Sequence, residues 1–181
     1  MKLSDASKQF ILHWGEMGTR WGVNRTVAQV HALLYLSPES LTAEDIAETL
    51  SVARSNVSTS LKELQNWDLV HIDNRICDRR DYFQTSADVW TLFLTVVDQR
   101  VEREIVPTLN MLRRCAIEAQ AERPTQPTVA VRITAMQVFL EDLLGWYSQI
   151  KKLPPASLRS LVSIGSGVTR ILPKMRRRRL D

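Results

Sequence analysis

Two short helical patterns separated by a three-residue turn, within residues 41–67, constrain the fold of this chain more than any other feature. Thr42 stands three residues before Asp45, which is the spacing of a capping box at a helix start. Beyond the turn, a second apolar stripe recurs at helical spacing: Val57, Leu61 and Leu64. The pattern predicts a helix-turn-helix whose second helix runs from about Arg54 to Trp67.

A hairpin pattern follows directly. Residues 69–72 are strand-like, residues 73–74 carry a turn signal, and Tyr82 and Phe83 begin the return strand after a charged tip at residues 75–81. A helix-turn-helix followed by a two-stranded ribbon is the plan of a winged helix-turn-helix. We therefore predict a mainly α fold with a small β-wing.

The outward face of the second helix is polar but almost uncharged. Opposite the apolar stripe lie Ser55, Thr59, Lys62 and Asn66, flanked by Asn56 and Ser58. Short hydroxyl and amide side chains can approach base edges in a major groove, while Arg54 and Lys62 can neutralise phosphates. The face therefore fits either DNA contact or an ordinary polar surface helix.

The tip of the hairpin sets two basic residues between two acidic ones: Asp78, Arg79, Arg80 and Asp81. A carboxylate there can hold one arginine and direct its guanidinium into a narrow minor groove, where the negative potential of DNA is deepest. A solvated hairpin is the alternative. The candidate DNA-binding residues are Arg54, Ser55, Asn56, Ser58, Thr59, Lys62, Asp78, Arg79 and Arg80.

With runs elsewhere in the chain, these residues resemble the MarR superfamily of bacterial winged-helix regulators. The resemblance covers about residues 8–110. It is closer to the GbsR branch on four runs: Gly15-Glu16-Met17-Gly18, Tyr35-Leu36-Ser37, Arg54-Ser55-Asn56-Val57-Ser58 and Arg103-Glu104-Ile105-Val106-Pro107. The resemblance implies a homodimeric transcription factor that binds a pseudo-palindromic operator in double-stranded DNA, usually as a repressor, with release controlled by a small-molecule inducer.

Carried over position by position, the resemblance places five side chains in the major groove: Arg54, Ser55, Asn56, Thr59 and Lys62. Asp78 with Arg80 would form the wing pair. Ala53 departs from the pattern, because such sequences commonly have a Ser or Thr cap there, and its loss weakens the helix start by ~1 kcal/mol. The ligand site is unknown. The five tryptophans fit an aromatic cage for a quaternary ammonium compound, or core packing.

Sequence signals outside the helix-turn-helix and the hairpin predict the other helices. Ser4 or Asp5 caps a first helix that ends near Gly18 in a glycine-rich break, and Asn24 caps a helix at residues 25–36. His31 has no metal-spaced partner, which predicts a hydrogen-bonded core histidine. Further along, we predict a long helix capped by Ser86, a kink or a new helix start at Pro107, a linker at residues 122–128, and helices at residues 129–153 and 156–163.

These patterns divide the chain into three parts. Residues 1–86 form the N-terminal helices and the DNA-binding domain, residues 87–164 form a helical dimerisation region, and residues 165–181 form a basic, disordered tail. The net charge of +4 is uneven, because residues 170–181 hold six basic residues against Asp181, which leaves residues 1–169 at −1. DNA binding therefore depends on where the charges stand rather than on bulk basicity.

Other function classes find little support in the sequence. No nucleophile, metal-spaced cluster or phosphate loop argues for an enzyme, a metal or a cofactor. The start of the chain lacks a signal-peptide pattern and no run is apolar enough to span a bilayer, so we expect a cytoplasmic protein. Cys77 fits either a redox sensor or an incidental surface thiol. The main alternative to a DNA-binding regulator is a winged-helix protein-interaction module that does not read DNA.

Overall fold

The computed structural model describes residues 3–121, 127–154 and 156–163 of the chain. These residues belong to two compact units, Met1–Gln99 and Arg100–Asp181. Helices dominate both units, and the first also contains a small antiparallel sheet. The predicted fold class, mainly α with a small β-wing, is therefore confirmed.

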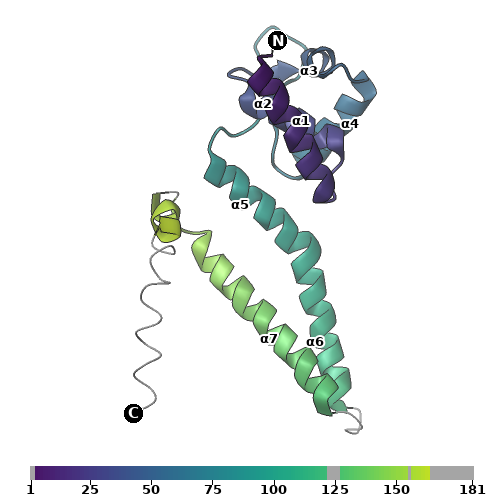
Figure 1. Ribbon diagram of the computed structural model, residues 1–181, viewed down its shortest axis with the longest axis vertical. Helices are drawn as coiled ribbons and strands as arrows, with labels where there is room; N and C mark the ends of the chain where they lie inside the picture. Colours follow the sequence, from purple (N-terminus) through teal and green to yellow (C-terminus); the bar gives the residue numbers. More distant parts are fainter. Residues whose placement is uncertain (1–2, 122–126, 155, 164–181) are drawn as a thin grey trace. The chain divides into compact units, whose positions relative to one another are not determined.

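The described residues of the first unit form five helices, labelled in Figure 1, and three strands. The helices are α1 (Asp5–Arg20), α2 (Arg25–Leu36), α3 (Ala43–Leu50), α4 (Arg54–Asn66) and α5 (Val89–Arg100). The core contains apolar side chains from each of the first four helices and from the sheet. At its centre lie Val30, Leu33, Ile46, Val57 and Leu64, each at most 1% exposed.

The helix α1 begins as predicted, because the Ser4 side chain accepts a hydrogen bond from the backbone amide of Ser7. The helix ends two residues after the predicted end near Gly18, at Arg20, and the turn lies at Trp21 and Gly22. Gly15 and Gly18 therefore belong to the helix rather than to the break. Both glycines are buried where α1 meets α2. A Cβ on Gly18 would lie 2.5 Å from the Cβ of Ala28, so the close approach of the two helices requires glycine there.

The helix α2 begins after Asn24, whose side chain accepts a hydrogen bond from the amide of Thr26, as predicted. His31 on this helix is buried, and its Nε2 lies 3.4 Å from the hydroxyl oxygen of Thr85. The prediction of a hydrogen-bonded core histidine is confirmed. Burial lowers the pKa of His31 to about 4, because the imidazolium would lose its hydration.

The helix-turn-helix forms where the sequence places it. Thr42 and Asp45 make both hydrogen bonds of the predicted capping box at the start of α3. Ser51 adopts a left-handed conformation, with φ of 54°, and ends that helix. Ala53 makes no side-chain cap at the start of α4, as the sequence implied. Despite this missing cap, α4 begins at Arg54 as predicted, because its apolar face packs into the core.

The sheet has three strands, which corrects the prediction of a two-stranded ribbon. Their order is β1 (Leu41–Thr42), β3 (Tyr82–Gln84) and β2 (His71–Asp73), with both neighbouring pairs antiparallel. The third strand was missed because it is only two residues long and directly precedes α3. The wing is therefore attached to the helix-turn-helix by backbone hydrogen bonds as well as by its own hairpin.

The start of α5 differs from the prediction in its capping residue. Asp88, rather than Ser86, accepts a hydrogen bond from the backbone amide of Thr91 inside the first turn, while Ser86 accepts one from the amide of Asp88. Leu92 and Val96 of this helix pack against the core of the first unit.

In the second unit, a π-helical turn, η1 (Val101–Ile105), leads into α6 (Val106–Ala121). Pro107 therefore lies in the first turn of α6, one residue later than the start position that the sequence suggested. At the end of η1, the amide of Val106 bonds to the carbonyl of Val101, five residues back. This wider turn accommodates a residue that cannot donate to the usual carbonyl.

The helix α7 (Pro127–Ile150) packs along α6 (Figure 1). It includes the last two residues of the predicted linker, whereas residues 122–126 lie outside the described residues. The predicted short helix at residues 156–163 is present. The predicted basic tail at residues 165–181 lies outside the described residues.

Candidate nucleic-acid interface

The helix α4 separates its two faces sharply. Val57, Leu61 and Leu64 are at most 2% exposed, and Ser60 is buried beside them. On the opposite side, the predicted residues Ser55, Asn56, Thr59 and Lys62 are exposed, and Ser58 is half-buried. A row of short polar side chains thus faces outward from a helix that its other face anchors to the core.

Arg54, at the first position of α4, is paired with a residue of α3. Its Nε donates to a carboxylate oxygen of Glu44 at 2.7 Å, and this hydrogen bond holds the pKa of Glu44 below its usual range. Both side chains are more than half exposed. Such a solvated pair is weak and can exchange Glu44 for a phosphate.

The wing tip contains a fixed ion pair. The Arg80 guanidinium donates from Nε and Nη2 to the two carboxylate oxygens of Asp78, at 3.1 and 2.7 Å, and the Arg80 backbone amide adds a third bond at 3.0 Å. These bonds lower the pKa of Asp78 well below its usual range, and the carboxylate in turn raises the pKa of Arg80. The pair therefore stays charged at any physiological pH.

Tyr82, which the sequence pattern predicts only as a strand residue, connects this pair to the sheet. Its hydroxyl accepts a hydrogen bond from Arg80 Nη2 at 2.7 Å and donates one to Asp78 at 2.8 Å. Donation to a carboxylate raises the pKa of Tyr82. The residue spacing Asp78-x-Arg80-x-Tyr82 is the signal that could have revealed it.

Arg75, also missed, stacks on the other part of the same tyrosine. Its guanidinium carbon lies 3.9 Å from the centre of the Tyr82 ring, and its Nη2 donates to the Ser40 hydroxyl at 2.9 Å. The Ser40 hydroxyl donates to Asp73 at 2.8 Å. Arg75 is thus occupied by contacts within the wing and its base.

A depression of about 310 Å³ lies between α4 and the wing. Arg54, Ser58 and Lys62 line it from the helix, and Arg79 and Arg80 line it from the wing. Apolar atoms of Leu61, Ile72 and Phe83 are also part of its wall. The structure therefore brings five of the nine predicted residues around one hollow, whereas Ser55, Asn56, Thr59 and Asp78 do not line it.

The described residues show no sign of a metal site or of a membrane-spanning helix. In the described part of the chain, no three His, Cys, Asp or Glu side chains are grouped so that they could hold a metal ion. None of the described helices combines the length and apolar character that a membrane crossing requires. Cys77 is exposed at the wing tip with φ of 67°, and Cys115 lies on α6 as a second free thiol.

The helix-turn-helix, the three-stranded wing and the hollow between them define a winged-helix domain. Residues 21–81 match the family model described as MarR family, and this stretch includes α2, α3, α4 and the wing tip. No curated protein matches the chain significantly.

Solved structures are similar to this chain to different degrees. A transcriptional regulator known from its crystal structure is 20% identical to this chain, covers 80% of it and 99% of its own length, and has a TM-score of 0.58. Two others are a Staphylococcus aureus MepR–DNA complex, with 18% identity, coverage of 65% and 95% and a TM-score of 0.37, and a MarR-family regulator from Rhodococcus sp. RHA1, with 14% identity, coverage of 75% and 87% and a TM-score of 0.37. The first of these shows the common fold.

Proposed function

We propose that this protein is a sequence-specific, DNA-binding transcriptional regulator. The observation that supports this most is the arrangement of α4 and the wing around one hollow lined by Arg54, Lys62, Arg79 and Arg80. A helix and a wing that enter adjacent grooves of a duplex have one sugar-phosphate strand between them. Four basic side chains line the hollow against two carboxylates, Glu44 and Asp81, so its lining carries a net positive charge that suits that strand.

The helix α4 and the wing would then read different parts of the DNA. The exposed hydroxyl and amide groups of Ser55, Asn56 and Thr59 are short enough to let α4 approach base edges in the major groove. Arg80, fixed at the wing tip, would enter the neighbouring minor groove. Lys62 and Arg54 would bind phosphates. The family match of residues 21–81 supports the same assignment, and the GbsR-like runs suggest that branch.

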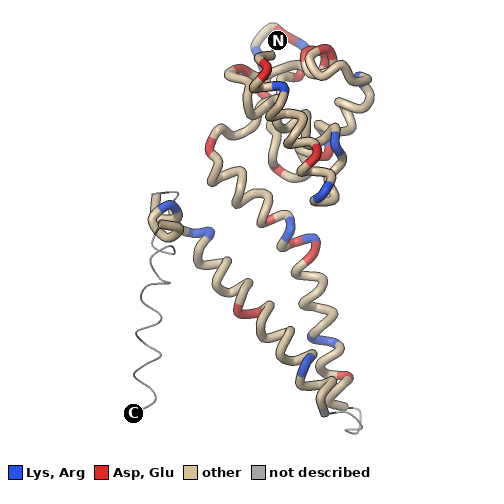
Figure 2. Tube along the Cα trace, viewed as in Figure 1, with Lys and Arg blue, Asp and Glu red and all other residues tan. Residues whose placement is uncertain are grey.

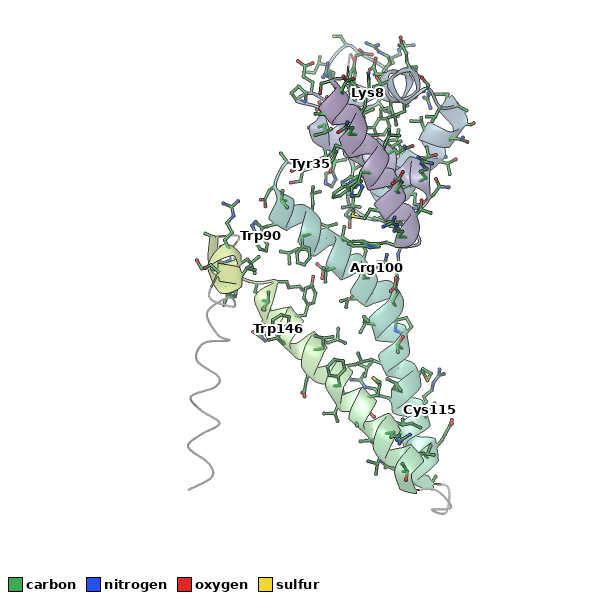
Figure 3. The ribbon with its side chains drawn as sticks, viewed as in Figure 1. Lys8, Tyr35, Trp90, Arg100, Cys115 and Trp146 are labelled. Atoms are coloured by element: carbon green, nitrogen blue, oxygen red, sulfur yellow. The ribbon has the colours of Figure 1, made fainter. Side chains whose placement is uncertain are left out.

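A direct test begins with selection of preferred duplexes from a random library, together with the DNA upstream of the protein's own gene. Affinity is then measured over a range of salt concentrations for the wild type, Lys62→Ala and Arg80→Ala. Lys62→Ala, which removes a phosphate contact, should reduce the slope of log affinity against log salt by about 1. Arg80→Ala, which removes the minor-groove contact, should weaken binding of the selected duplex and relax its sequence preference. Lys8→Ala, an exposed lysine on α1 (Figure 3), is the matched control and should leave the slope unchanged.

The absence of any sequence preference in the wild type would contradict a role as a regulator and favour a protein-interaction module. An unchanged preference in both Lys62→Ala and Arg80→Ala would show instead that DNA is read by another surface.

We also propose that the protein is a homodimer and acts as a repressor on a pseudo-palindromic operator. The helix α7 supports the dimer, because it has only three charged residues, Arg132, Glu141 and Asp142. The rest of this helix is tan in Figure 2, the colour of residues other than Lys, Arg, Asp and Glu. Although Leu140 and Tyr147 are buried, several large apolar side chains remain exposed: Val131, Met136, Val138, Phe139 and Trp146. A helix that is apolar around its circumference requires cover on more than one side.

In the dimer, two winged-helix domains bind one face of the duplex, where successive major grooves are ~34 Å apart. Phe139→Glu puts a charge on the exposed apolar side of α7 and should give a monomer by light scattering, with strongly reduced operator affinity. Gln149→Glu, an exposed polar position on the same helix, is the control and should stay dimeric. A wild type that is monomeric at micromolar concentration would contradict the dimer.

The proposed regulator is released by a small molecule, as the family resemblance implies. Trp14 and Trp67 pack against the core of the first unit, so these two are poor candidates for an aromatic cage. A titration of tryptophan fluorescence with choline and glycine betaine tests quaternary ammonium compounds as inducers. No response to either compound would remove this class.

A further inference from the structure

The wing tip is held at both ends by one side chain. Arg75, at the start of the tip, stacks on the Tyr82 ring with its guanidinium carbon 3.9 Å from the ring centre. Asp78 and Arg80, at the end of the tip, both bond to the Tyr82 hydroxyl, at 2.8 and 2.7 Å. The hydroxyl thus binds the Asp78–Arg80 pair, while the ring face holds Arg75 and lies 5.4 Å from the guanidinium carbon of Arg80.

Tyr82 itself has little freedom to move. It belongs to the central strand β3, where it pairs with Thr42 of β1 on one side and Asp73 of β2 on the other. The residue is only 7% exposed. Thr42 is also the capping residue of α3, so the chain that holds Tyr82 is continuous with the helix-turn-helix.

The ion pair of the wing tip needs such an anchor. The Arg80 side chain is 62% exposed and that of Asp78 is 27% exposed. An exposed ion pair by itself holds two side chains only weakly, because solvent screens the attraction and side-chain entropy opposes it. The Tyr82 hydroxyl, placed between the guanidinium and the carboxylate, supplies an attachment to the rigid sheet.

We propose that Tyr82 is the positioning residue of the wing, which fixes the direction of the Arg80 guanidinium before DNA arrives. This inference rests on the proposed DNA-binding function and specifies how its wing is prepared. The three tip arginines then differ in role: Arg75 clamps the loop onto Tyr82, and Arg79 and Arg80 both line the hollow beside α4. Of these two, Arg80 is the one that Tyr82 directs towards the minor groove.

The substitution Tyr82→Phe separates the contribution of the Tyr82 hydroxyl from that of its ring. Phenylalanine keeps the ring, its burial and its stacking with Arg75, and removes only the hydroxyl. In the free, full-length protein, ¹⁵N relaxation of the Arg80 Nε–H group should report an ordered side chain in the wild type and a mobile one in Tyr82→Phe. Tyr35→Phe, which removes a hydroxyl from α2, is the matched control and should leave the Arg80 signal unchanged.

Binding of the selected DNA provides the second measurement. Disordering one long side chain before binding should weaken affinity by roughly fivefold per wing. The loss should nearly disappear when Tyr82→Phe is made in an Arg80→Ala background, because Tyr82 acts through Arg80. Urea unfolding of Tyr82→Phe, followed by circular dichroism, establishes that the comparison is made on folded protein.

Two results would overturn the inference. One is an Arg80 side chain that is equally ordered, or equally mobile, in the wild type and in Tyr82→Phe. The other is a loss of DNA affinity that is equally large in the wild-type and Arg80→Ala backgrounds. Because the relaxation measurement uses no DNA, it decides the role of Tyr82 even if the wild type shows no sequence preference and the proposed function itself fails.

Discussion

His31 gives a quantitative prediction about the pH dependence of stability. It is 6% exposed, and Thr85 is its hydrogen-bonding neighbour. The Thr85 hydroxyl already donates to the carbonyl of Leu69 at 2.6 Å, so its oxygen is the acceptor for a proton on His31 Nε2. The neutral imidazole suits this arrangement, and burial lowers the pKa of His31 from 6.5 to about 4.

The direction in which the free energy of unfolding changes with pH depends on which state, folded or unfolded, takes up the proton first. As pH falls from 6.5 towards 4, the unfolded chain protonates its histidine while the folded chain keeps His31 neutral, so the free energy of unfolding decreases. With these two pKa values, the loss is about 2 kcal/mol at pH 5 and about 3 kcal/mol at pH 4. The contribution is fully present only above pH 6.5.

The assay is urea unfolding at pH 7.5 and pH 5 of the wild type and His31→Gln, at equal protein concentration. Glutamine stays neutral and the carboxylates are common to both proteins, so the stability advantage of the wild type should shrink by about 2 kcal/mol between the two pH values. His13→Gln, an exposed histidine on α1, is the control. An advantage that is the same at both pH values would refute the reasoning.

Three further predictions concern contacts within the first unit. Gly18→Ala should cost about 1–3 kcal/mol in urea unfolding because its Cβ would lie 2.5 Å from that of Ala28, and an unchanged midpoint would contradict this contact. Thr42→Ala removes the cap of α3 and should cost about 1 kcal/mol in thermal unfolding. Asp78 should remain ionised when the pH falls below the ordinary pKa of an aspartate, because Arg80 stabilises the carboxylate. The measurement is an NMR titration of the Asp78 carboxyl carbon, and a midpoint near pH 3.9 would contradict the ion pair.

Much of the helical part was predictable because periodicity and capping act locally. The start of α2 after Asn24 and the capping box at Thr42 need only neighbouring residues, and both were predicted. The continuation of α1 through Gly15 and Gly18 was not predictable from α1 alone. It depends on the approach of α2, which compensates for the low helix propensity of glycine.

The same distinction applies to the candidate interface. The outward face of α4 follows from helical geometry, and the exposure of Ser55 and Thr59 agrees with it. The roles of Arg75 and Tyr82 escaped prediction because they depend on the hairpin register and on a contact with Ser40, 35 residues before Arg75. The DNA contacts themselves stay a prediction.

The most direct test of the account is a crystal structure of the protein bound to its selected DNA. We expect α4 in the major groove with Ser55 and Thr59 at base edges, Arg80 in the adjacent minor groove, and the intervening phosphates in the hollow between α4 and the wing. A complex in which the outward face of α4 and the tip of the wing remain free of DNA would contradict the central claim.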